Sequence, residues 1–133
     1  MNLVYAYVCG DILHEGHILQ LENAKAMGDK LIVGILTDEA VTEKKAKPII
    51  SFAQRLILVQ SLECVDMVVP QHEYSPIVNV KSLGVDILME SASHLGNDYL
   101  KDLEKLDVRV IMTPYYPGCS STDIKNKIKE VKP

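Results

Sequence analysis

Two histidines, His14 and His17, lie three positions apart in a short segment between an apolar run and a helical pattern. A loop that leads from a buried strand into a helix N-terminus presents free backbone amides and the positive end of the helix dipole, which favour phosphate. Gly16 lets the backbone come close to a ligand. Asp11, just upstream, can orient a histidine or help hold a metal-bound nucleotide. The segment is therefore a candidate anion site.

The plainer interpretation of the two histidines is that they are polar loop and cap residues. As a zinc pair they are incomplete, because H-x-x-H alone lacks further ligands and the glutamate base of H-E-x-x-H. Near the other end of the chain, the hydroxyls of Ser120, Ser121 and Thr122 open the last predicted helix. Ser120 with Asp123 is also a capping-box pattern. Both interpretations hold together there, since a capped helix whose first turn offers hydroxyls and amides also cradles phosphate.

The elements that must position these residues alternate between strands and helices. Short apolar, β-prone runs predict strands at residues 2–9, 30–37, 65–69, 86–89 and 108–112. Apolar residues at helical spacing predict helices at 16–28, 51–62, 97–106 and 120–131, with another that starts at 75. We expect Gly28 to cap the first helix, Pro70 to stop the third strand, and the polar stretch 38–47 to form a loop.

This alternation predicts the α/β class: a Rossmann-like, doubly wound parallel sheet of five strands in a single domain, residues 1–133. In such sheets ligands bind beyond the carboxyl ends of the strands, where the strand order reverses. The segments that follow strands, 9–16, 38–50, 90–96 and 113–120, are therefore where we expect the site.

Bulk composition excludes several classes of protein. The chain is 47% hydrophobic and 24% charged with a net charge of −4, which argues against a general nucleic-acid binder. Three widely spaced cysteines form neither a disulfide framework nor a zinc motif. No leader pattern and no apolar run of about 18 to 20 residues is present, so we expect a cytoplasmic protein without a membrane span.

The segment 11–17, D-I-L-H-E-G-H, resembles the H-x-G-H signature of the cytidylyltransferase-like nucleotidyltransferases. Other stretches agree with that family in order and spacing: the second predicted strand, the lysines of 44–47, the helix start at 50–55, and the segment 118–125. Within the family, the likeness is strongest to glycerol-3-phosphate cytidylyltransferases and to cytidylyltransferase domains associated with phosphonate synthesis. The V-D-M-V-V-P run at 65–70 resembles their third strand.

The resemblance implies transfer of a nucleotidyl group, with CTP the favoured donor, to a small phosphate- or phosphonate-bearing acceptor, and release of pyrophosphate. It implies catalytic roles for His14, His17, Lys44 and Arg55. It implies nucleotide binding by Val8, Cys9, Gly10, Asp11, Gly16, Lys47, Ser120, Ser121 and Thr122. No protein metal ligand is expected. Mg²⁺ is expected to bind through the nucleotide phosphates, and relatives of this size suggest a homodimer.

Two segments depart from the family pattern. Val8-Cys9-Gly10-Asp11 stands where the family often has G-T-F-D, and residues 90–95 match its G-D-D-W-like segment poorly. Glu90 and His94 are either part of a different acceptor site or solvated loop residues. Lys44 and Lys47 can also be plain surface lysines, and Arg55 can pair with an acid such as Glu63.

Two other functions stay open at this point. One is an adenylyltransferase of the same superfamily that acts on FMN or a sugar phosphate. The other is a nucleotide-binding module without catalysis, which the retention of both histidines, Arg55 and the serine–threonine cluster argues against. Binding of nucleic acid is not expected.

Overall fold

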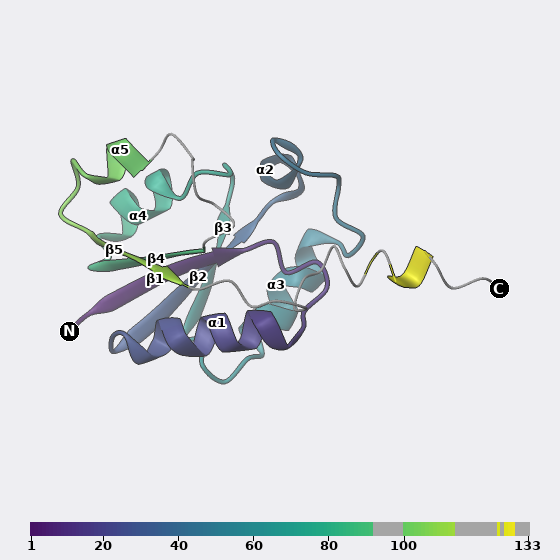
Figure 1. Ribbon diagram of the computed structural model, residues 1–133, viewed down its shortest axis with the longest axis horizontal. Coiled ribbons are helices and arrows are strands. Elements are labelled where there is room, and N and C mark those ends of the chain that lie inside the picture. The colour runs from purple at the N-terminus through teal and green to yellow at the C-terminus, as the bar shows by residue number, and fades with distance from the viewer. Residues whose placement is uncertain (92–99, 114–124, 126, 130–133) are drawn as a thin grey trace.

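The computed structural model describes residues 1–91, 100–113, 125 and 127–129 (Figure 1). Five strands form one parallel sheet in the order β3-β2-β1-β4-β5. The strands are β1 (Leu3–Val8), β2 (Lys30–Leu36), β3 (Met67–Gln71), β4 (Ile87–Ser91) and β5 (Arg109–Thr113). The helices are α1 (Glu15–Ala26), α2 (Asp38–Thr42), α3 (Phe52–Gln60), α4 (Ile77–Leu83) and α5 (Leu100–Leu103). The Rossmann-like α/β prediction is confirmed.

Helices cover both faces of the sheet, which is why the central strands are apolar along their length. Figure 1 shows α1 and α3 on one face and α2, α4 and α5 on the other. Alternate residues of β1 serve the two faces: Val4, Ala6 and Val8 pack with α1 and α3, whereas Tyr5 and Tyr7 pack with α2, α4 and α5. The two resulting cores hold the strand ends, and hence the loops of the site, in fixed positions.

The loop predicted at 38–47 is partly wrong, because α2 occupies its first five residues. The Thr37 side chain caps this helix by accepting a hydrogen bond from the backbone N–H of Ala40 at 3.2 Å. Ala40 and Val41 are buried against the sheet. A cap followed by two small apolar residues was the available signal, but the surrounding charged residues obscured it. The turn after α2 continues directly from the helix, so the segment with Lys44, Lys45 and Lys47 starts from a fixed helix end.

Two other boundary predictions are wrong. Pro70 does not stop the third strand; it lies within β3, opposite Ile35 of β2. Since β3 is at the edge of the sheet, a residue without an N–H is tolerated there. Met27, and not Gly28, is the C-cap of α1. Gly28 is required for a different reason, since a Cβ there would lie 2.7 Å from Val4 Cγ2.

Of the apolar residues at helical spacing that predict a helix at 16–28, Leu21 and Ala24 are buried, whereas Ile18 is 38% exposed and does not belong to the buried face. The apolar residues at helical spacing that predict a helix at 51–62 do form its buried face, with Val59 buried and Phe52, Leu56 and Leu62 packed against the same core. Lys125 and residues 127–129 are helical. The rest of the helix predicted at 120–131, and residues 97–99 of the helix predicted at 97–106, lie outside the described residues.

A candidate nucleotide site at the carboxyl ends of β1 and β4

The strand order reverses between β1 and β4, which are neighbours in the sheet although far apart in sequence. Chains that leave these two strands diverge to opposite faces, and such a point is where open α/β sheets bind ligands. The segment after β1 runs from Cys9 to His14 and enters α1 directly. The candidate residues predicted at 8–17 therefore lie at this edge of the sheet.

The two histidines form a reciprocal cap on α1. His14 is the N-cap residue, and its Nδ1 accepts a hydrogen bond from the backbone N–H of Gly16 at 3.0 Å. His17 Nδ1 in turn accepts from the backbone N–H of His14 at 3.2 Å. The two ring centroids are 4.1 Å apart. The plainer interpretation, that these histidines cap the helix, is thus correct, and it does not exclude a role in binding.

This cap fixes the chemical form of both rings. An imidazole whose Nδ1 accepts a hydrogen bond carries its proton on Nε2 when neutral. Burial lowers the pKa of His14, and burial together with the charges of His14 and Lys45 lowers the pKa of His17 to about 4. Near pH 7 both rings are therefore neutral, and each presents its Nε2–H as a hydrogen-bond donor at the start of α1.

The turn before the cap depends on Gly10 and Asp11. Gly10 has a φ of 72°, a conformation that side chains disfavour. Asp11 is 2% exposed, and its Oδ1 accepts from the backbone N–H of Ile50 at 2.8 Å. Burial opposes ionisation of Asp11, but the hydrogen bond from Ile50 and the Lys125 ammonium outweigh it and lower its pKa. Asp11 thus holds the turn against the segment that precedes α3.

Lys125 brings the C-terminal part of the chain to the same place. Its Nζ forms an ion pair with Oδ2 of Asp11. Nothing in the local sequence predicted this contact, because its two partners come from opposite ends of the chain. The predicted phosphate ligands Ser120, Ser121 and Thr122 lie outside the described residues. Lys125 follows them closely in sequence and is anchored beside the histidine cap.

Arg55 is entirely buried and joins several elements. Its Nη1 donates to the carbonyls of Cys9 at 2.7 Å and Leu36 at 2.6 Å, which stand just after β1 and at the end of β2. Its Nε donates to the carbonyl of Ile50 at 3.1 Å, and its Nη2 pairs with Asp38 at 2.7 Å. The alternative pairing with Glu63 is not what the structure contains. Contact of Arg55 with a phosphate stays a prediction. The hydrogen bonds by which Arg55 connects the segments after β1 and β2 with the start of α3 are observed.

The lysine segment lies between α2 and α3, and both of its ends are anchored. Lys44 and Lys47, the predicted candidates, are exposed. Lys45 extends α2 by one turn through a hydrogen bond from its N–H to the carbonyl of Val41 at 2.9 Å. The positive charge of Lys45 helps to lower the pKa of His17, so Lys45 acts electrostatically on the histidine cap. The sequence analysis did not select Lys45, because its position among the three lysines alone does not distinguish it from Lys44 and Lys47.

On the other face of the sheet, a carboxylate is buried at the same edge. Glu90, next to last in β4, has an exposed fraction of 0%, and the Tyr7 hydroxyl lies 2.8 and 2.9 Å from its two oxygens. Burial first, and then the charges of Glu90 and Cys9, raise the pKa of Tyr74. The poor match of residues 90–95 to the family pattern was the available signal, but it did not reveal that Glu90 is buried.

Val8 and Cys9 contribute backbone and packing to the turn. Val8 is buried with α1 and α3, and the Cys9 side chain packs on the opposite core. Burial raises the pKa of the Cys9 thiol, with smaller and opposing effects from Arg55 and Asp11, so the thiol stays protonated near pH 7.

Among the described residues no group of three or more histidine, cysteine, aspartate or glutamate side chains is arranged to hold a metal ion. Within those residues no helix has the length and apolar character needed to cross a bilayer.

A parallel α/β sheet with a neutral histidine pair capping the helix after its first strand is an arrangement suited to an anion such as a nucleotide phosphate. The comparisons with known proteins agree with this class. Residues 8–127 match the model of the cytidylyltransferase-like family. This chain therefore belongs to the cytidylyltransferase-like family of nucleotidyltransferases.

Among curated proteins, it is 37% identical over 130 residues to the bifunctional protein HldE of Helicobacter pylori strain J99. It is 35% identical over 135 residues to the protein of the same name from Campylobacter fetus. Each match covers 96% of this chain and 28% of the relative, so the chain spans little more than a quarter of the length of these proteins.

Among solved structures, a lipopolysaccharide core biosynthesis protein from Thermoplasma volcanium superposes with a TM-score of 0.78 and 27% identity. The match covers 87% of this chain and 98% of that protein. A pantoate–β-alanine ligase from Francisella tularensis shares the fold, with a TM-score of 0.56 and 19% identity over 98% of this chain and 70% of its own.

Proposed function

We propose that this protein transfers a nucleotidyl group from a nucleoside triphosphate to a phosphate or phosphonate oxygen of a small acceptor. The observation that carries the proposal is the reciprocal cap of His14 and His17, which occupies both Nδ1 atoms and leaves two neutral Nε2–H groups as donors at the N-terminus of α1. Membership of the cytidylyltransferase-like family supports the same reaction.

In this reaction an anionic acceptor oxygen attacks the α-phosphorus, and a new P–O bond forms. The bond from the α-phosphorus to the bridging oxygen breaks, and pyrophosphate leaves with the electron pair. No proton has to be removed from the acceptor, because its oxygen is already ionised near pH 7. Catalysis then depends on positioning the two reactants and on stabilising the charge that builds around phosphorus.

The two histidines suit the second task. Their Nε2–H groups would donate to the α-phosphate and the bridging oxygen, and the free amides at the start of α1 would add to them. A neutral imidazole donates without repelling Mg²⁺. We propose that Mg²⁺ binds through the phosphate oxygens and keeps several of its waters, as this ion commonly does in nucleotide sites.

The lysines and Arg55 differ in their surroundings. Lys44, Lys45 and Lys47 carry their charge on an exposed segment next to the cap, and we propose that they draw negative charge from the acceptor and the departing pyrophosphate. Arg55 is shielded from solvent by the loops it connects, so we propose that it positions those loops. Ser120, Ser121 and Thr122 remain proposed ligands of the β- and γ-phosphates.

CTP is the donor that the sequence motifs favour. A second candidate is an adenylyltransferase acting on a sugar phosphate. It is favoured by the similarity to a lipopolysaccharide core biosynthesis protein, at 27% identity over 98% of that protein. The match covers 28% of the bifunctional relative, so only that part of the relative bears on this proposal.

The test is pyrophosphate release in the presence of Mg²⁺, with CTP, ATP, GTP and UTP each combined with a panel of acceptors. The panel contains glycerol 3-phosphate, two short phosphonates, phosphocholine, a heptose phosphate and FMN. Acceptor-dependent release with one nucleotide, reduced about 10²- to 10³-fold in His17→Ala, supports the proposal and identifies the donor. The exposed His72→Gln is the control and should keep full activity. No release with any pair, from protein that still binds nucleotide, would favour the non-catalytic module.

A further inference from the structure

The lysine segment of the proposed site begins at the C-terminal end of α2. This helix has five residues, too few to be stable without tertiary contacts. Its C-cap residue is Glu43, and the backbone N–H groups of Lys44 and Lys45 continue the last turn by donating to the carbonyl of Val41 at 3.1 and 2.9 Å. The direction in which the lysines leave α2 therefore depends on what fixes this last turn.

The side chain of Glu43 supplies a tertiary contact at this turn. Its Oε2 accepts a hydrogen bond from the backbone N–H of Tyr74 at 2.9 Å. Tyr74 lies between β3 and α4, 31 residues further along the chain. A carboxylate that accepts from a backbone N–H makes a charge-assisted hydrogen bond, which is stronger than one between neutral groups. Glu43 thus connects the end of α2 to the turn that follows β3.

The turn after β3 is itself fixed by Gln71, the last residue of β3, which is 1% exposed. Its side-chain Nε2 donates to the carbonyls of Glu73 and Tyr74 at 3.0 and 3.2 Å. Its backbone carbonyl accepts from the N–H of Thr37, the N-cap residue of α2, at 3.0 Å. Both ends of α2 are therefore connected to one buried residue of the sheet, directly through Thr37 and by way of Tyr74 through Glu43.

An exposed glutamate beside several lysines is ordinarily a solvated residue or the ion-pair partner of a neighbour. The hydrogen bond from Tyr74 distinguishes Glu43 from a merely solvated residue. Within the part of the chain that the structure describes, no ion pair joins Glu43 to any of the three lysines. The charge of Lys45 acts instead on the histidine cap, where it helps to lower the pKa of His17. Glu43 therefore fixes the start of the lysine segment without neutralising it.

We propose that Glu43 is a positioning residue for nucleotidyl transfer. By holding the last turn of α2 to the turn after β3, it directs the lysine segment toward phosphates bound at the histidine cap. This role requires the hydrogen bond from Glu43 to the backbone and not the charge of Glu43. The inference rests on the proposed function and adds to it a residue that acts through the lysines and touches neither substrate.

Substitutions of Glu43 separate the length of its side chain from its charge, with kcat and KM measured for the nucleotide and acceptor that support turnover. Glu43→Gln has the same length, and its amide oxygen accepts the same hydrogen bond, so kcat should stay within about threefold of wild type. Glu43→Asp keeps the charge but is one methylene shorter, and Glu43→Ala has neither property. Both should lower kcat by about 10- to 100-fold with little change in KM, because misplaced lysines no longer face the charge that builds around phosphorus.

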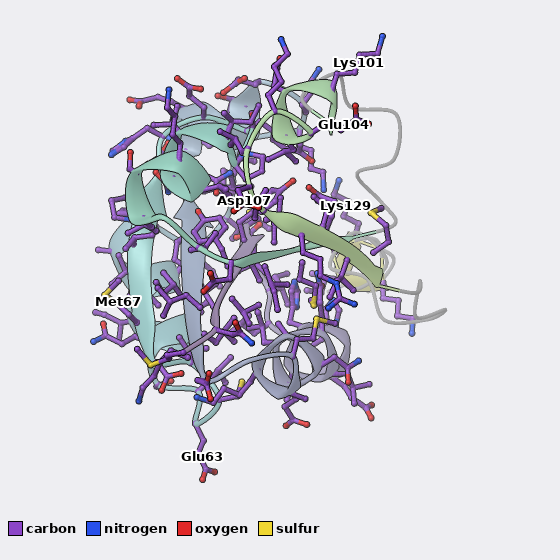
Figure 2. The ribbon with its side chains drawn as sticks, turned by 90° about the vertical axis from the view of Figure 1, so that its left-hand side faces the viewer. Glu63, Met67, Lys101, Glu104, Asp107 and Lys129 are labelled. Atoms are coloured by element: carbon purple, nitrogen blue, oxygen red, sulfur yellow. The ribbon has the colours of Figure 1, made fainter. Side chains whose placement is uncertain are left out.

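Two exposed acids serve as controls. Glu39→Ala removes a carboxylate from α2 itself, and Glu63→Ala removes one that Figure 2 shows pointing away from the body of the protein. Both variants should keep the wild-type kcat. In a chain whose three lysines are replaced by alanine, Glu43→Ala should lower kcat by less than about twofold more, because a residue that acts through the lysines then has nothing to position. A purely structural role would lower kcat equally in both backgrounds.

Tryptic cleavage after Lys45 reports on the same contact without turnover. In Glu43→Ala and Glu43→Asp this cleavage should be about tenfold faster than in the wild type, because a turn that has lost its hydrogen bond opens more often. Glu43→Gln removes the same charge near the cleaved bond but should be cleaved at nearly the wild-type rate.

Glu43→Gln and Glu43→Asp decide the question even when Glu43→Ala does not fold. A Glu43→Gln protein as slow as Glu43→Asp, or a Glu43→Asp protein as fast as wild type, would overturn the role of Glu43 and leave nucleotidyl transfer standing. Equal tryptic cleavage of wild type and all variants would also overturn it, since the contact would then not hold the segment. Absence of pyrophosphate release from the wild type with every nucleotide and acceptor would overturn both the proposed function and this inference.

Discussion

At the scale of single residues, the strongest consequence of the fold is the chemical state of His17. Its Nδ1 is occupied by the backbone N–H of His14, and burial then makes a second proton unfavourable. The same hydrogen bond that caps the helix thus sets which nitrogen faces a ligand. A sequence motif identifies the residue types but not this arrangement, which requires the backbone of α1 to be in place.

The lowered pKa of His17 predicts how stability depends on pH. The unfolded chain binds a proton at this residue below its ordinary pKa of 6.5, whereas the folded protein does so only near 4. Between these values the unfolded state holds more protons, so stability is full above pH 6.5 and falls as the pH drops toward 4. The loss is at most about 1.4 kcal/mol per pH unit for this one group.

Urea denaturation at several pH values measures this effect. The midpoint of wild-type unfolding should decline between pH 6.5 and 4 more steeply than that of His17→Gln, which cannot titrate. The exposed His72→Gln serves as the control and should decline like the wild type. Parallel curves for wild type and His17→Gln would mean that the His17 ring is protonated in the folded protein as readily as in the unfolded chain.

At the scale of elements, Arg55 connects segments that the sequence places far apart. Its guanidinium joins the ends of β1 and β2, the start of α2 and the segment before α3, and it lies 5.6 Å from the centre of the Phe52 ring. These are the segments that carry the histidine cap and the lysines. The geometry of these two loops of the candidate site therefore depends on one side chain that is itself shielded from solvent.

Replacing Arg55 should destabilise the whole protein. Arg55→Met leaves three carbonyl groups and the Asp38 carboxylate without their donor, and we expect a loss of about 3 to 5 kcal/mol in the free energy of unfolding. Arg55→Lys should lose less, since it keeps the charge but cannot reach all the partners. Urea denaturation compares these variants with Arg109→Met, a change at an exposed arginine of β5 that should cost little. An Arg55→Met protein as stable as wild type yet inactive would instead support direct contact between Arg55 and phosphate.

The elements themselves were largely predictable, whereas the contacts between them were not. Apolar strands such as β1 and β2, and the periodic face of α3, are encoded locally and were found. The wrong boundaries followed local preferences of proline and glycine that the tertiary structure overrides. Pro70 is tolerated within β3 because β3 is an edge strand, and Gly28 is needed for close packing against Val4. Tyr7 meets Glu90 because β1 and β4 are neighbours in the sheet, and Asp11 meets Lys125 only in the folded chain. Local sequence patterns contain no information about such pairs.

At the scale of the whole molecule, the candidate site unites contributions from almost the entire chain. Segments after β1 and β2, the end of β4, the start of α3 and Lys125 all meet at one edge of the sheet. Several of them bear groups suited to phosphate. Nucleotide bound there should therefore hold these segments together, and its affinity should appear as global stability.

Thermal unfolding tests this coupling without requiring turnover. A ligand that binds only the folded protein at about 100 times its Kd adds about 2.7 kcal/mol, which for a domain of this size raises Tm by about 10 °C. We expect such a shift with Mg²⁺ and the true donor, CTP or ATP, and a clearly smaller one with the other nucleotides. His17→Ala at the same ligand concentration should lose most of the shift, because a phosphate donor is removed, while His72→Gln should retain it. Equal shifts for all four triphosphates would show that the site recognises phosphate but not the base, and the absence of any shift would contradict nucleotide binding at this edge of the sheet.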